Sequence, residues 1–194
     1  GLKWQLPLLD ADRVDLLVKW AVRQRNTDDL DEALVLLLPA YAALRGSDAA
    51  LSLRRKVAYG DARALSWAAV FGSLVGKERD FAFAQMVPDE FYASDNGALA
   101  IGRIAPLLDR NQLVTAIGWI VANHAGERAS VLTPLVESAV QRDSRQAYDA
   151  WEAVLANASL RNAEDAVAYL CVAIPLAARL GGQKALVGLE RALE

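Results

Sequence analysis

Apolar residues recur three and four positions apart along most of this 194-residue chain. The residues between them are mainly Ala, Leu, Arg, Glu and Gln, which favour helices, and the alternation typical of strands is nearly absent. In the segment 12–25, for example, Val14 and Leu17 share one helical face, whereas Asp15 and Lys19 lie away from it. The pattern therefore predicts an all-α fold.

Glycine and polar stop signals divide the chain into about ten helices of similar length. The predicted ranges are 12–25, 28–45, 47–58, 61–75, 77–86, 95–108, 111–124, 127–142, 144–157, 163–180 and 183–193. Because the connections are short, sequential helices should run antiparallel, as hairpins stacked in a short α-solenoid or as a globular multi-helix bundle. We expect one domain over residues 1–194, with a sub-boundary near 87–97 as a further option. The chain opens with Gly1 and has no initiator Met there, which is typical of an excised or processed segment.

Four prolines lie within strongly apolar, helix-like runs, at Pro39, Pro106, Pro134 and Pro175. An interior proline removes a backbone hydrogen bond and bends its helix, so these positions predict bent or paired helices. Glu32 precedes Pro39 at the same spacing as Glu127 precedes Pro134, which suggests related helices. The intervals between all four prolines are unequal, so they indicate degenerate hairpins and do not define a repeat unit.

The C-terminal segment has the spacing of a helical repeat. An aromatic residue and large-small pairs are followed by an alanine-led second helix, at Ala168, Tyr169, Val172, Ala173, Leu176, Ala185, Leu189, Ala192 and Leu193. Residues 168–194 therefore resemble a tetratricopeptide repeat and, more generally, a HEAT-like helical array. Pro175 departs from the tetratricopeptide pattern. The resemblance implies a scaffold that binds other proteins.

Composition excludes several functional classes. Hydrophobic residues make up 54% of the chain, and 21 basic against 24 acidic side chains leave a net charge of only -3. Without a basic field, nucleic acid is a disfavoured partner. The longest uncharged apolar runs, 33–44, 65–76 and 166–178, are shorter than the roughly 20 residues of a membrane span, so none is expected. Cys171, the single cysteine, lies in a run expected to be a buried helix and favours a reducing, cytoplasmic location.

The candidate chemical groups have structural explanations. His124 falls at a predicted helix end, where it should cap carbonyls. The acidic residues of 28–32 fall at a predicted helix start, which Thr27 or Asp28 should cap. Asp89 and Glu90 also fall at a predicted helix start, where acidic residues are favourable. The basic cluster 54–56 is interpreted as a solvated helix face. We therefore predict no catalytic residue, no metal ligand and no cofactor.

Aromatic side chains and a methionine gather around Pro88 and form the candidate partner-binding set Phe81, Phe83, Met86, Phe91 and Tyr92. A packed junction between two halves of the domain is the competing explanation. Core packing is expected of the tryptophans at Trp20, Trp67, Trp119 and Trp151.

The function that these observations favour is a non-catalytic protein-protein interaction module that receives a protein or peptide partner. The alternatives are an all-helical enzyme or small-ligand binder with an apolar pocket near 81–92, and nucleic-acid binding through a HEAT-like groove. The sequence does not determine an oligomeric state.

Overall fold

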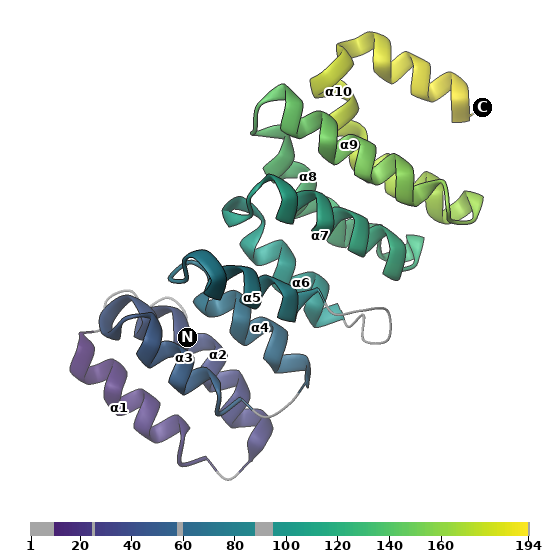
Figure 1. The fold of residues 1–194 in the computed structure, drawn as a ribbon. Helices are drawn as coiled ribbons and strands as arrows, with labels where there is room; N and C mark the ends of the chain where they lie inside the picture. Colours follow the sequence, from purple (N-terminus) through teal and green to yellow (C-terminus); the bar gives the residue numbers. More distant parts are fainter. Residues whose placement is uncertain (1–9, 25, 58–59, 88–94, 194) are drawn as a thin grey trace. The chain divides into compact units, whose positions relative to one another are not determined.

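The computed structural model describes residues 10–24, 26–57, 60–87 and 95–193. This part of the chain forms ten α-helices and contains no strand (Figure 1). The predicted all-α class is therefore confirmed.

The chain divides into two compact units. Unit 1 comprises Gly1–Pro88 with Ser94–Ala100, and unit 2 comprises Asp89–Ala93 with Ile101–Glu194. The division therefore falls within α6 (Asp95–Ile104). Whether residues 1–194 fold as one domain stays a prediction.

Unit 1 is built on α2, which contacts three other helices of the unit. Its helices are α1 (Ala11–Ala21), α2 (Thr27–Arg45), α3 (Ser47–Arg54), α4 (Gly60–Phe71) and α5 (Gly76–Met86). Helices α1, α3 and α4 pack on α2, and α5 packs on α4. The core between them contains Leu34, Leu38 and Phe71, each fully buried. Burial of these apolar faces stabilises helices that are too short to persist alone in water.

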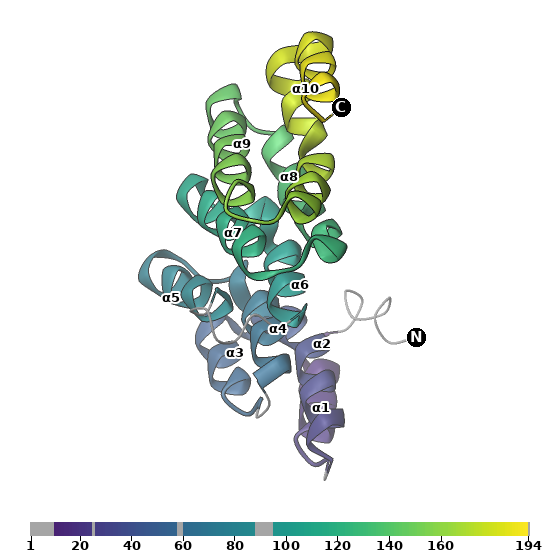
Figure 2. The same cartoon turned by 90° about the vertical axis from the view of Figure 1, so that its right-hand side faces the viewer.

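In unit 2, each helix packs on the next helix but one in the sequence. Its further elements are α7 (Arg110–Asn123), the 3-10 helix η4 (Gly126–Leu132), α8 (Thr133–Val140), α9 (Ser144–Ala158) and α10 (Ala163–Leu193). Helix α7 packs along α9, and α10 packs on α9, η4 and α8. Within this unit α7 and α9 form one layer, and α8 and the first part of α10 form the other (Figure 2).

Short polar side chains cap several helix starts. Asn26 accepts a hydrogen bond from the Asp28 amide at 3.2 Å, so the cap of α2 is Asn26, although the sequence suggested Thr27 or Asp28. At α7, Asp109 and Gln112 form a reciprocal capping box. These bonds satisfy amide groups that have no partner within the helix.

Two predicted helices are interrupted by proline. The range 95–108 ends as an α-helix at Ile104 and continues as a 3-10 helix (η3, Ala105–Leu107) that contains Pro106. The prediction of one helix over 127–142 is wrong, because residues 126–132 are 3-10 and α8 begins at Thr133 with Pro134 in its first turn. Proline is favoured there, since the amide hydrogens of a first turn have no helical acceptor.

The other two prolines lie within helices. Pro39 is inside α2 and Pro175 is inside α10, and both rings are exposed. The matching spacings of Glu32 to Pro39 and Glu127 to Pro134 therefore mark different local structures, one a helix interior and the other a helix start.

Helix α10 is interrupted where the sequence predicted a break. Gly182 has φ 59° and ψ -154°, a conformation that a Cβ atom disfavours and glycine adopts freely. Among the described residues, Ala163–Gly182 is the single helical segment whose length and composition would allow it to cross a membrane. In this structure the segment packs on α8, α9 and η4, and its Tyr169, Ala173 and Leu176 are fully buried. The expectation of no membrane span stays a prediction, and Cys171 lies exposed on this helix, contrary to the buried position expected.

The end of α7 is attached to the beginning of α10 by side chains. The carbonyl oxygen of His124 accepts hydrogen bonds from Arg161 Nη2 at 2.7 Å and from the Tyr169 hydroxyl at 3.0 Å. Asp165 accepts from Arg161 Nη2 at 3.0 Å and from the Gly126 amide at 2.7 Å. The sequence assigned the capping of this helix end to the His124 side chain, but that ring is buried edge-on against Trp119, 5.4 Å between centroids.

Gly126→Ala should destabilise unit 2. A Cβ atom at this position would lie 2.6 Å from the Asp165 Cα, so the backbones must separate and the bond from the Gly126 amide to Asp165 weakens. We expect the free energy of unfolding to fall by about 2 kcal/mol, measured by urea denaturation. Ala125→Ser, at the exposed neighbouring position, is the control and should be nearly neutral. An equal effect of both changes would contradict the close approach.

Pro39→Ala should stabilise the protein, because it restores a backbone hydrogen bond inside α2 at an exposed position where no cavity forms. The expected gain in free energy of unfolding is about 1–3 kcal/mol. Pro134→Ala, in a first turn, should give no gain and a loss below about 1 kcal/mol. Urea unfolding of both variants, monitored by circular dichroism, measures these differences in free energy. A destabilised Pro39→Ala variant would mean that the packing of α2 depends on the proline.

Candidate functional site

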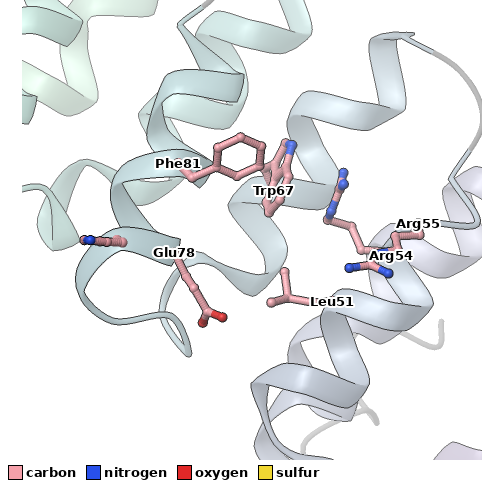
Figure 3. Close-up of a pocket in the computed structure, with 7 residues that line it drawn as sticks. Leu51, Arg54, Arg55, Trp67, Glu78 and Phe81 are labelled. Atoms are coloured by element: carbon pink, nitrogen blue, oxygen red, sulfur yellow. The ribbon is translucent and has the colours of Figure 1, made fainter.

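A pocket of about 470 Å³ lies within unit 1, where α3, α4 and α5 meet (Figure 3). Its lining residues are Leu51, Arg54, Arg55, Trp67, Lys77, Glu78 and Phe81. Exposed residues at the rim, among them Arg55, Lys77 and Phe81, leave it accessible from solvent. We call this the Arg54 pocket.

Helix α3 positions one wall through its last turn. Leu51, Arg54 and Arg55 are spaced three and four residues apart, so they share one side of the helix. Arg54 is the last helical residue, and Arg55 caps the end through its amide, which bonds to the Leu51 carbonyl at 3.3 Å. Basic side chains are favourable at a helix C-terminus, which has the negative end of the helix dipole.

Trp67 forms the centre of the pocket wall. The guanidinium carbon of Arg54 lies 3.5 Å from the centroid of the indole ring, a cation-π contact. Phe81 meets the same indole edge-on, with 5.6 Å between ring centroids and an interplanar angle of 80°. Figure 3 shows the indole between these two neighbours. Trp67 itself is 5% exposed, whereas Phe81 is 56% exposed.

The Arg54 charge is only weakly compensated by its surroundings. The side chain is half-buried, its one described hydrogen bond is a long contact of 3.5 Å from Nη1 to Ser66 Oγ, and its Nε is buried without an acceptor. Burial, with further contributions from the positive charges of Arg63 and Arg55, lowers the pKa of Arg54 to about 10, well below the ordinary value of an arginine. Trp67 Nε1 is a second buried donor without an acceptor. Unpaired buried donors are costly, so an incoming acceptor would be favourable here.

The pocket lining has an excess of positive charge. In the part of the chain that the structure describes, Arg54, Arg55 and Lys77 share the lining with a single carboxylate, Glu78. Between these charges the surface is formed by rings and by Leu51. Such an arrangement can bind and orient a ligand that combines an acceptor group with apolar surface. Among the described residues, no group of three His, Cys, Asp or Glu side chains could hold a metal ion.

The predicted partner-binding residues fall in different environments. Phe81 lines the Arg54 pocket and is exposed to a partner. Phe83 and Met86, on the same helix, are 8% and 0% exposed and belong to the core of unit 1. Phe91 and Tyr92 lie outside the described residues. The structure therefore leaves Phe81 as the one described member of the set that a ligand can reach directly.

Sequence reasoning overlooked Arg54 and Trp67 as site residues. The basic cluster 54–56 was interpreted as a solvated face, yet Arg54 is half-buried on an aromatic ring. The expectation that Trp67 is buried is confirmed, but one ring face meets a cation. The spacing of Leu51 to Arg54 and Arg55 was the available signal, and it does not say which aromatic residue lies opposite.

Trp20 corrects another expectation, since it is 59% exposed and does not belong to the core. It lines a second pocket of about 560 Å³ between α1 and α2, with Leu17 and Leu36 on its walls and Asp29 and Glu32 beside them. Trp20 lies outside the buried face of α1, because Val14, Val18 and Ala21 form that face.

No protein-family model matches this chain, and no curated protein or solved structure matches it at a significant level. The tetratricopeptide-like or HEAT-like character of residues 168–194 stays a prediction. Tyr169, Ala173 and Leu176 are buried as that spacing requires, but any amphipathic helix buries such a face. Functional inference therefore rests on the pocket residues themselves.

Arg54→Met should leave the fold intact. Methionine keeps a polarisable side chain against Trp67 and removes a desolvated charge, so the free energy of unfolding should equal or exceed that of the wild type. Arg161→Met is the matched comparison. It removes three hydrogen bonds, to Ala122, His124 and Asp165, and should cost about 2 kcal/mol or more. Equal destabilisation of both variants in urea would show that Arg54 is structural.

A comparison of the wild type with Arg54→Met tests the pKa of Arg54. In the folded state this pKa is about 10, below the ordinary value of an arginine, because burial penalises the charged form. As the pH rises through the folded pKa, the folded protein loses the proton while the unfolded chain keeps it. The stability of the wild type relative to Arg54→Met should therefore increase from about pH 9 to about pH 11. A flat difference would contradict the shift.

Proposed function

We propose that this protein is a non-catalytic interaction module whose helical hairpins stack in a short α-solenoid of tetratricopeptide-like or HEAT-like character. A segment of a partner protein binds at the Arg54 pocket. The location we propose is the cytoplasm.

The observation that carries this proposal is the exposed ring of Phe81 held against Trp67 beside Arg54. Aromatic and arginine side chains contribute much of the energy of protein interfaces, especially where a pocket surrounds them. Phe81 retains 56% exposure although an apolar ring gains from burial. A partner that covers it would remove this apolar surface from water.

The pocket walls are pre-organised by the fold. Leu51, Trp67 and Phe81 each project from a different helix, and packing of α3 and α5 on α4 sets their separation. Binding a segment between such walls requires little ordering of the module itself, which lowers the entropic cost of association.

A peptide-display selection tests the proposal. Random peptides displayed on phage are selected on the wild-type protein, and the recovered clones are tested against Phe81→Ser and Leu160→Ser. Both positions carry exposed apolar side chains, but Leu160 is 82% exposed, belongs to unit 2 and does not line the pocket. We expect binding to fall by about tenfold or more with Phe81→Ser and to persist with Leu160→Ser.

Two results would overturn this function. The selection could yield no clone that binds above background, or the recovered clones could bind equally to wild type and Phe81→Ser. Circular dichroism of both variants confirms that each is folded, and Phe81→Ser should unfold close to the wild type because its ring is largely exposed.

A further inference from the structure

We infer that the Arg54 pocket recognises an acidic peptide segment, in which a carboxylate side chain contacts the Arg54 guanidinium and a neighbouring apolar side chain packs on Phe81 and Leu51. This inference rests on the proposed function, because it names the chemistry of the partner at the same pocket.

The first observation is that Arg54 differs from other arginines of the molecule. Arg45 pairs with Asp15 at 2.6 Å, Arg161 pairs with Asp165 at 3.0 Å, and Arg110 pairs with Asp149. Arg54 is half-buried and has no carboxylate partner among the described residues. A desolvated guanidinium without a counterion is the group that gains most from an incoming carboxylate.

The second observation is the sign of the surrounding charge. Arg55 and Lys77 stand at the rim with Arg54, and Glu78 is the one carboxylate among the described residues of the lining. Three cations against one anion attract an acidic segment and repel a basic one. The whole chain has a net charge of -3, so this excess is local.

The third observation is the pair of buried donors at the pocket wall. The Arg54 guanidinium lies over the Trp67 ring, and neither Arg54 Nε nor Trp67 Nε1 has an acceptor. Both atoms are buried in this structure, so a carboxylate reaches them only if the Arg54 side chain changes its rotamer. Arginine binds carboxylates through two parallel N–H donors, a geometry that such a shift would allow at the Nε edge.

The pocket favours a carboxylate over a phosphate group. Its walls are mainly apolar, at Leu51, Trp67 and Phe81, and Glu78 opposes a second negative charge. A dianionic phosphate is more strongly hydrated than a carboxylate and would lose more on entering such surroundings. The volume of about 470 Å³ has room for an acidic side chain and an apolar neighbour.

Two matched peptide libraries test the inference. One encodes Asp and Glu, and in the other these are replaced by Asn and Gln. Clones are counted as pocket binders only if Phe81→Ser abolishes binding. The recovered peptide is then synthesised with its acidic residue and with the corresponding amide, and both affinities are measured by fluorescence anisotropy on wild type, Arg54→Met and Arg79→Met. Arg79 is the control, since it lies over Phe71 at 4.8 Å in the same unit and does not line the pocket.

We expect pocket binders from the acidic library and few or none from the amide library. Changing the acid to the amide, or Arg54 to Met, should each weaken binding by about tenfold, and the two changes together should cost little more than one alone. Arg79→Met should bind as the wild type does. In nitrogen-15 NMR spectra, the Arg54 Nε–H and Trp67 Nε1–H signals should shift when the acidic peptide is added.

The contrary outcomes separate the two proposals. Equal recovery from both libraries would overturn the acidic specificity and leave the interaction module standing. Absence of Phe81-dependent binders from both would overturn the proposed function and this inference with it. If inorganic phosphate displaces the peptide at lower concentration than acetate does, the assignment of a carboxylate is wrong. Unchanged Arg54 and Trp67 signals on saturation would also overturn it.

Discussion

Close packing of helix against helix through small side chains is the constraint on which the rest of the structure depends. Each helix satisfies its own backbone hydrogen bonds, so the units cohere through side-chain faces alone. Fully buried alanines occur along these faces, at Ala21, Ala50, Ala82, Ala100, Ala116, Ala139, Ala147, Ala150 and Ala173. Alanine lets two helices approach closely, and at Gly102 the approach is closer still, with Pro134 3.2 Å from where a Cβ would stand. The Arg54 pocket lies where α3, α4 and α5 meet, and the larger residues Trp67 and Phe81 line it.

The arginines occupy two kinds of environment, one that serves stability and one to which the proposed function assigns binding. Arg161 and Arg142 donate to backbone carbonyls of neighbouring segments, Arg142 to Leu108 at 2.6 Å, and these bonds satisfy helix ends. Arg54 is placed over an aromatic ring with its Nε unpaired and its pKa lowered. Selection for stability alone would remove such a charge, because burying it without a counterion is unfavourable. Sites that depart from local optimisation in this way are where a ligand is expected.

Much of the local structure could be predicted because its causes are local. The stop at Gly46, the break at Gly182 and the start of α9 after Asp143 follow from glycine backbone freedom and from carboxylate capping within three residues. The role of proline could not be predicted, since the same residue lies inside a helix at Pro39 and in the first turn of one at Pro134. Which of these occurs depends on whether the preceding turn already forms α-helical hydrogen bonds. The run before Pro39 is wholly apolar, whereas Arg128, Ser130 and Thr133 interrupt the run before Pro134.

The sequence by itself determined the all-α class and most helix ends, because helical periodicity and capping act over a few residues. It also directed attention to Phe81. Only the tertiary structure decided that Phe81 stays exposed while Phe83 and Met86 are buried, and that Arg54 lies on Trp67 from another helix. The reason is that these outcomes depend on which helix faces which. The pairing of helix faces is determined by the sum of many weak apolar contacts between segments that are distant in sequence. No short stretch of sequence therefore determines this pairing.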